Sequence, residues 1–147
     1  MIQLVISSFV ITFCYAIIFQ VRGKNIFYAS LGASLGSVVY DVCMNAGLHY
    51  FLALLYTSIA ISCYSEVMSR KRKAPVTLFL ISAIICFVPG GLMYHTMAEI
   101  IQGNMEKSVS LGMEALASAG ALALGIMITS SLFKVYIFVK RTWRSAV

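Results

Sequence analysis

Residues 87–95 read FVPGGLMYH, and they interrupt an apolar run that extends from Pro75 to about Ile101. Proline has no backbone N–H and clashes with the preceding helical turn, while glycine adopts backbone angles that other residues resist. The stretch therefore predicts a helix that is broken at Pro89–Gly91. Non-helical backbone within a membrane is tolerated only where protein or a water-filled cavity surrounds it. We predict that the break lies near the middle of the bilayer and contributes to a binding site; a simple proline kink used for packing is the alternative.

The composition is that of an integral membrane protein. Of the 147 residues, 61% are hydrophobic and only 16 are charged, and the mean hydropathy is +0.92. Soluble domains are about 45–50% apolar, so this chain has too few polar residues to cover a soluble fold. The length predicts a single transmembrane domain over residues 1–147. The net charge is +6. In a membrane protein, basic residues first serve to set the topology, so this charge does not predict a nucleic-acid partner.

Five stretches are long and apolar enough to cross ~30 Å of hydrocarbon as helices. We predict an all-α bundle of five transmembrane helices at about residues 2–21, 26–46, 48–68, 75–101 and 109–133, followed by a basic tail, 134–147. The tail either continues the last helix, with Lys134 reaching toward the interface, or lies along the membrane surface. Trp143 suits an interfacial position in both cases.

The basic residues predict the orientation of the bundle. Ten of the eleven lie on one side, in the turn after the first helix, in the motif RKRK at residues 70–73, and near the C-terminus. Lys107 lies on the other side. Because basic residues concentrate on the cytoplasmic side, we predict that the N-terminus is outside and the C-terminus inside. A stop-transfer role is sufficient to explain RKRK, and a lipid-binding or regulatory role is the alternative.

The second predicted helix carries two stripes of small residues. Glycine, alanine and serine let helices approach closely in lipid, so the first stripe predicts helix packing; it consists of Ala29, Gly32, Ala33 and Gly36. The second stripe is a line of hydroxyls that ends in a carboxylate, and packing alone explains it less well; it consists of Ser30, Ser34, Ser37 and Asp41.

Ionisable residues within the spans are candidate functional residues, because burying charge in hydrocarbon is costly. On the fourth helix, Gly91, His95 and Glu99 are spaced four residues apart, so His95 and Glu99 can meet across one turn, with Tyr94 adjacent. On the fifth, one face carries Glu114, Ser118, Ala121, Gly125 and Thr129. We predict substrate-binding or coupling roles for Tyr94, His95, Asp41 and Glu114, beside Pro89, Gly90 and Gly91. A structural role is the alternative for Asp41 and Glu114, and an interfacial position is the alternative for Glu99.

The sequence carries no motif for catalysis, a metal or a cofactor. It contains no GxSxG, HExxH, glycine-rich phosphate loop or Cys/His metal spacing. The four cysteines lie in apolar runs without a CxxC motif, so we interpret them as buried hydrophobes. We therefore expect neither an enzyme nor a cofactor.

Three stretches resemble one family of membrane proteins. FQVRGKN at 19–25, LGASLGSVVYD at 31–41 and, above all, KAPVTLFLISAIICFVPGGLMYHTM at 73–97 are similar to the threonine/serine exporter (ThrE-like) family. The similarity is to its small five-helix, YjjB-type subunit and covers nearly the whole chain. Its most specific element, a PG pair after an apolar run and before a tyrosine, falls here on Pro89, Gly90, Gly91 and Tyr94.

The resemblance implies half of a ten-helix exporter, whose two five-helix halves are fused or encoded as two chains. This chain would be the separate C-terminal half in a bacterial cytoplasmic (inner) membrane, in contact with lipid. Its partner would be the companion five-helix subunit, a homo-oligomer, or both. The substrates that the resemblance implies are threonine and serine, or dicarboxylates such as succinate.

The sequence is compatible with three functions. The first is a subunit of a secondary transporter that exports a small amino or carboxylic acid, coupled to the proton gradient. The second is a non-transporting membrane scaffold or regulatory subunit, which would need no intramembrane carboxylates, so Asp41 and Glu114 discriminate between the two. The third is a small multidrug exporter, which would need an aromatic-lined pocket and no partner chain.

Overall fold

The computed structural model describes residues 2–21 and 23–145, and this part of the chain contains helices and no strand. The elements are α1 (Ile2–Ile18), α2 (Asn25–Asn45), α3 (Tyr50–Arg72), α4 (Val76–Ile84), the short 3-10 helix η1 (Ile85–Phe87), α5 (Gly90–Ile101) and α6 (Met105–Ser145). The all-α prediction is confirmed for the described residues.

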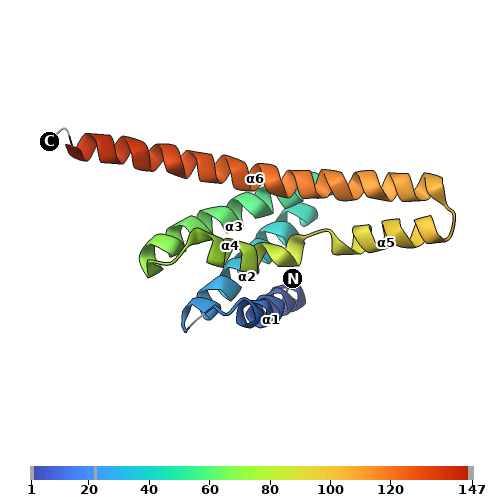
Figure 1. Ribbon diagram of the computed structural model, residues 1–147, viewed down its shortest axis with the longest axis horizontal. Coiled ribbons are helices and arrows are strands. Elements are labelled where there is room, and N and C mark those ends of the chain that lie inside the picture. Colours follow the sequence, from blue (N-terminus) through green and yellow to red (C-terminus); the bar gives the residue numbers. More distant parts are fainter. Residues whose placement is uncertain (1, 22, 146–147) are drawn as a thin grey trace.

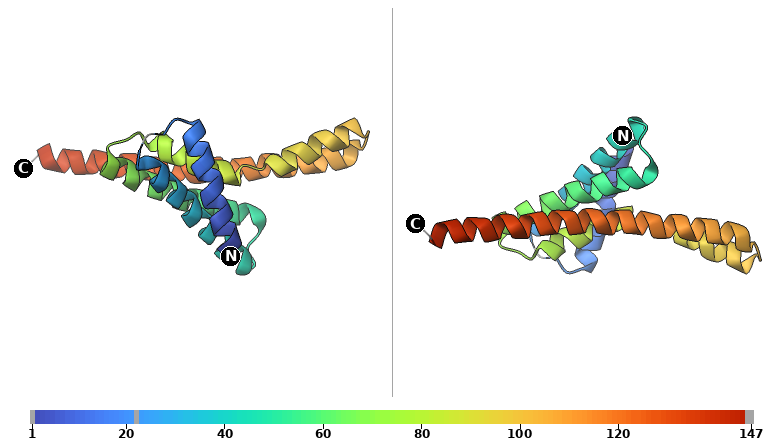
Figure 2. Two further views of the ribbon diagram at one scale, coloured as in Figure 1. Left: turned by 90° about the horizontal axis from the view of Figure 1, so that it is seen from below. Right: turned by 90° about the horizontal axis from the view of Figure 1, so that it is seen from above.

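Helices α1 to α4 form a bundle, and α6 runs along the length of the molecule beside α3 (Figure 1). Within the bundle, α2 packs against α1, α3 and α4, and α3 packs against α4 and α6. Helix α5 packs on α6 and points away from the bundle, which Figure 2 shows from two further directions. We call α5 together with residues 105–117 of α6 the α5–α6 arm.

The helix ends follow from residues that adopt left-handed backbone angles. Gly47, with φ of +77°, follows the end of α2, and Gly103, with φ of +82°, follows the end of α5. Glycine adopts this conformation without the steric cost that a Cβ brings. Lys73 takes it at the end of α3, with φ of 52°, and Pro75 then precedes α4. These turns reverse the chain between successive helices.

The structure does not confirm the predicted count of five membrane spans. Three segments are long and apolar enough to cross a membrane, namely α2, α3 and Met105–Phe138 of α6. The bent pair Val76–Phe87 and Gly90–Ile101 makes a fourth if it counts as one broken span, whereas α1 is a shorter apolar helix of 17 residues. The five-span count and the orientation of the bundle therefore stay predictions.

The last helix is longer than predicted at both ends. We expected residues 109–133, but α6 begins at Met105 and is continuous through Lys134 to Ser145. The tail thus continues the helix. The apolar part alone, 34 residues, would be ~51 Å long at 1.5 Å per residue, so it exceeds a hydrocarbon core of ~30 Å. The side chain of Trp143, for which we predicted an interfacial position, lies outside the described residues.

Small residues allow the closest helix contacts in the bundle. The four residues Ala29, Gly32, Ala33 and Gly36 are all buried. A methyl group on Gly32 would come within 2.9 Å of the Tyr64 ring, and one on Gly36 within 2.6 Å of Ile61, both on α3. The side of α2 that carries these glycines is therefore a close contact with α3, of the kind that small residues permit in lipid.

Candidate functional site at the helix break

The predicted break is present and lies between η1 and α5. Val88 is extended, with φ of −63° and ψ of 132°, and Pro89 follows with φ of −74° and ψ of 54°. The residue before a proline is disfavoured in the helical region, which accounts for the extended Val88. The helical segments on either side are bent by 50°. Val88 lies ~18 Å along the chain from Val76 at 1.5 Å per residue, a little beyond half of a ~30 Å core.

The two glycines lie in the first turn of α5 rather than in the break itself. We expected the helix to restart near Leu92, but it restarts at Gly90, because the Pro89 carbonyl already accepts a hydrogen bond from the Met93 amide at 3.1 Å. No side chain caps this end of α5. The amides of Gly91 and Leu92 belong to the first turn, where a helix supplies no acceptor.

The glycines are surrounded by open space. Gly90 and Gly91 are exposed, and a methyl group on either would meet no atom within 4 Å. Pro89, in contrast, is buried. The break therefore has one side anchored in the bundle and one side that no described residue of this chain covers.

A cavity of about 200 Å³ lies on the bundle side of the break. It is formed where α1, α2 and α3 meet η1, and its lining residues are Leu4, Ser8, Tyr40, Tyr50, Leu54, Cys86, Phe87 and Val88. The Cys86 thiol lies 3.2 Å from the Thr12 hydroxyl and contacts the Ser8 carbonyl oxygen at 3.8 Å. The lining thus combines apolar side chains with hydroxyl and thiol groups and contains no charged residue.

Two tyrosines of this cavity were missed by the sequence interpretation. Tyr40 on α2 and Tyr50 on α3 have their ring centroids 6.4 Å apart, and the Tyr40 ring lies 6.3 Å from that of Phe87. Both tyrosines flank the α2–α3 turn in the sequence. That position is a signal that could have identified them, because consecutive helices joined by a short turn place their adjacent ends together.

The line of serines on α2 does not offer free hydroxyls. Each one bonds a carbonyl of its own helix, and the bonds run from Ser30 to Ile26, from Ser34 to Ser30 and from Ser37 to Ser34. Such bonds satisfy a hydroxyl without a partner from another helix. Asp41, at the end of the line, accepts a hydrogen bond from the Asn45 amide at 3.1 Å.

The other candidate residues lie on the α5–α6 arm. Tyr94 and His95 are exposed on α5, with ring centroids 5.5 Å apart, and Glu114 is exposed on α6. Among the described residues, no hydrogen bond or ion pair joins Asp41, His95 and Glu114 to one another. Within this chain, the structure does not bring the three ionisable candidates together.

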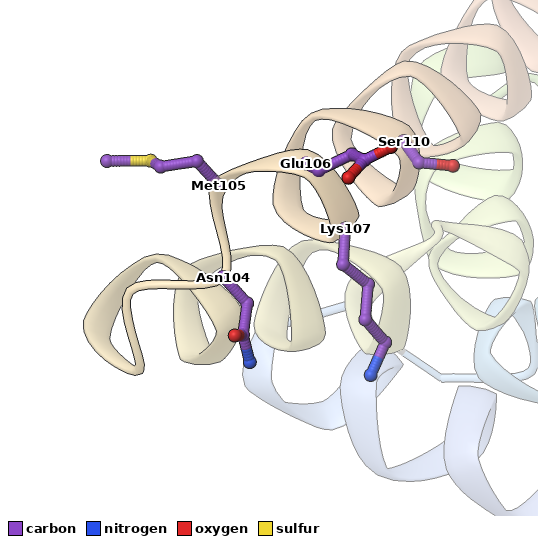
Figure 3. A pocket seen from close by; sticks show the side chains of 5 residues that line it. All are labelled: Asn104, Met105, Glu106, Lys107 and Ser110. Carbon is purple, nitrogen blue, oxygen red and sulfur yellow. The ribbon is translucent and has the colours of Figure 1, made fainter.

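Glu99 contacts the next helix instead of meeting His95. It accepts a hydrogen bond from Asn104 at 2.8 Å and pairs with Lys107 at 2.5 Å. Figure 3 shows the side chains of Asn104 and Lys107 extending to the same side of the α5–α6 turn, with Met105 pointing away. An open hollow of about 630 Å³ lies at this turn, and its lining includes Glu106 and Ser110. The ion pair ties the two helices of the arm together at the turn.

Comparison with known proteins identifies the family. The family model described as "Threonine/Serine exporter, ThrE" matches residues 4–132, which is most of the chain. The chain belongs to the threonine/serine exporter (ThrE) family. The resemblance to this family that the sequence predicts is thereby confirmed. The matched region contains the ThrE chain's cavity, its break and the whole α5–α6 arm.

One curated relative is longer than this chain. An uncharacterized protein of Haemophilus influenzae is 23% identical over an alignment of 127 residues, which covers 81% of this chain and 43% of the relative. The chain therefore spans less than half the length of that relative. No solved structure matches the chain significantly.

Proposed function

We propose that this ThrE chain is one subunit of a secondary exporter of small amino acids or carboxylates, either threonine and serine or a dicarboxylate such as succinate. The observation that carries the proposal is the broken helix α4–η1–α5, which borders a cavity inside an apolar bundle. Discontinuous helices form substrate sites in other secondary transporters, because the free amides and the positive end of a half-helix attract a carboxylate. In this role, Pro89, Gly90 and Gly91 form the part of the site that receives the carboxylate.

The companion of this subunit is a second five-helix chain that covers the α5–α6 arm. Helix α5 has no buried residue, and large apolar side chains on the arm are exposed, including Met97 at 64% and Ile101 at 84%. The size of the Haemophilus influenzae relative supports a larger functional unit, since this chain spans 43% of it. Copies of the same chain are the competing occupant of this surface. We place the complex in a bacterial cytoplasmic membrane.

We assign proton coupling to ionisable residues on the exposed surface of this subunit. His95 and Glu114 are exposed on the arm, so a companion packed there would enclose them together with Tyr94. Enclosure would withdraw them from lipid and water and would make their protonation depend on the conformation of the complex. Asp41 is the candidate on the bundle side, where its only hydrogen-bonded side chain among the described residues is Asn45.

The experiment measures efflux of labelled threonine and labelled succinate from cells that express this chain, its family companion, or both. We expect efflux of one substrate only when both chains are present, and we expect a protonophore to abolish it. Asp41→Asn and Glu114→Gln should reduce efflux without loss of the complex, whereas the matched control Glu106→Gln, on an exposed residue of the arm, should not. Normal efflux in both test variants would favour a scaffold or regulatory role.

A further inference from the structure

One face of α6 is buried in the middle of the helix and uncovered toward its C-terminal end. Its residues are spaced three or four positions apart, so they lie on one side of the helix; they are Ser118, Leu122, Gly125, Thr129, Leu132 and Tyr136. The first four are buried. The change is abrupt, because Thr129 is 2% exposed, whereas Leu132 is 65% exposed and Tyr136 59%. The same apolar face thus loses its cover within about one helical turn.

The face is uncovered because α3 and α6 diverge toward their C-terminal ends, as Figure 1 shows. The two helices are in close contact at Gly125 of α6. Farther along, the long side chain of Arg70 on α3 reaches α6, and its guanidinium carbon lies 5.1 Å from the centroid of the Phe133 ring. An open hollow of about 310 Å³ lies here, and its lining residues are Leu132, Phe133 and Tyr136. A leucine and two aromatic rings suit an apolar occupant.

The end of α3 beside this hollow carries four consecutive basic residues, 70–73, and all four are exposed. Two of them are held in place by contacts within the bundle. Arg70 forms an ion pair with Glu66 at 3.2 Å. Arg72 donates a hydrogen bond to the Asn25 side chain of α2 at 3.1 Å. Side chains that are already held in place lose less conformational entropy when they bind an anion.

The other two basic residues of this run have no partner. Among the described residues, no hydrogen bond or ion pair involves the side chain of Lys71 or Lys73, and Glu66 is the only acidic residue paired with the run. The run therefore keeps three positive charges without an acidic partner. In the predicted orientation, it lies at the cytoplasmic surface of the membrane, where anionic headgroups attract basic segments.

An apolar hollow beside an excess of positive charge fits an anionic amphiphile. A soluble anion would not fill the hollow, and an apolar protein segment would not compensate the charges. We propose that the hollow where α3 and α6 diverge binds an anionic phospholipid. Its acyl chain lies against Leu132, Phe133 and Tyr136, and its phosphate is bound at the basic end of α3, with Arg70 bordering both parts. This lipid site does not depend on the proposed export function.

Lipid retention by the purified chain in detergent tests the proposal. Native mass spectrometry counts the lipids that stay bound after dioleoyl phosphatidylglycerol or dioleoyl phosphatidylcholine is added at equal concentration. The two lipids have the same acyl chains, so a difference reports the headgroup charge. We expect the chain to retain phosphatidylglycerol at concentrations at which it releases phosphatidylcholine. Glycerophosphoglycerol, the headgroup without acyl chains, should not displace the bound lipid.

The unpaired lysines test the headgroup contact. The double variant Lys71→Gln, Lys73→Gln should weaken phosphatidylglycerol binding about five- to twentyfold, because each basic residue near an anionic headgroup contributes to binding. The variant should fold normally, since neither side chain has a partner among the described residues. Lys107→Gln is the control for loss of charge, because Lys107 lies ~38 Å along α6 from Leu132 at 1.5 Å per residue.

A larger side chain tests the acyl-chain contact. Leu132→Trp should fill the hollow and weaken phosphatidylglycerol binding without loss of charge. Leu124→Trp is the matched control, because Leu124 is also exposed on α6 but does not line the hollow. The melting temperatures of both variants, measured without added lipid, show whether the fold is intact.

Four results would overturn the proposal. Equal retention of the two lipids would mean that the hollow takes lipid without regard to charge. Unchanged binding of phosphatidylglycerol in both the lysine variant and Leu132→Trp would place the lipid elsewhere on the chain. Displacement by glycerophosphoglycerol would identify a site for soluble anions. A dimer that dissociates in Leu132→Trp would show that this face of α6 is an interface between copies of the chain.

Discussion

Gly125 of α6 lies against Ser58 of α3 so closely that no side chain fits between them. A methyl group on Gly125 would overlap the Ser58 hydroxyl oxygen and come within 2.9 Å of the Leu55 carbonyl oxygen. The Ser58 hydroxyl already donates a hydrogen bond to that same carbonyl at 2.8 Å, so it could move away from a methyl group only by breaking this bond. This contact fixes α6 against the bundle, and the α5–α6 arm extends from it.

We therefore expect Gly125→Ala to destabilise the protein by about 1–3 kcal/mol, the usual cost of forcing extra atoms into a packed contact. Thermal unfolding in detergent measures the effect. Gly120→Ala is the matched control on the same helix, because a methyl group there meets nothing within 4 Å. Equal melting temperatures for the two variants would show that α6 does not pack on α3 in this way.

The α2–α3 contact gives a second prediction. Gly36→Leu should lower the yield of folded protein and of complex, because even a methyl group on Gly36 would lie 2.6 Å from Ile61 and 3.1 Å from Phe87. Gly32→Leu, which meets the Tyr64 ring, should have the same effect. Size-exclusion chromatography with the companion measures the yield. Normal amounts of complex from both variants would mean that this side of α2 faces lipid.

The glycines at the start of α5 should behave differently. Gly90→Ala and Gly91→Ala should fold normally, since neither methyl group meets an atom within 4 Å and alanine favours helix by up to ~1 kcal/mol over glycine. If the break receives substrate, both variants should export poorly, because the methyl groups crowd the first-turn amides. Efflux is compared with melting temperature and complex yield in the same samples. Normal export in both variants would show that the break does not receive substrate and is a kink that serves helix packing.

The orientation can be tested at the C-terminal end of α3. In a chain without its native cysteines, Lys71→Cys should resist impermeant thiol reagents in intact cells, because ten of the eleven basic residues are predicted to be cytoplasmic. Lys107→Cys, on the opposite side, should be labelled. Labelling at position 71 and protection at position 107 would show that the orientation is the reverse of the predicted one.

The sequence by itself determined the membrane class, the family and the break. Each of these depends on local chemistry: apolar runs that a soluble fold would not tolerate, and a proline whose missing N–H interrupts a helix wherever the chain lies. Motifs within 19–25, 31–41 and 73–97 were sufficient to predict the ThrE family, which the match over residues 4–132 confirmed.

Only the tertiary structure decided which of the apolar surfaces meet. In lipid, helices do not associate to bury apolar surface, so the hydropathy of the segments does not say which helices become neighbours. Tyr40 and Tyr50 lie on either side of one turn, but no sequence pattern joins them to Cys86, and yet all three line one cavity. Glu99 pairs with Lys107 across a turn, although His95 is closer in sequence, because the left-handed Gly103 brings α6 back beside α5.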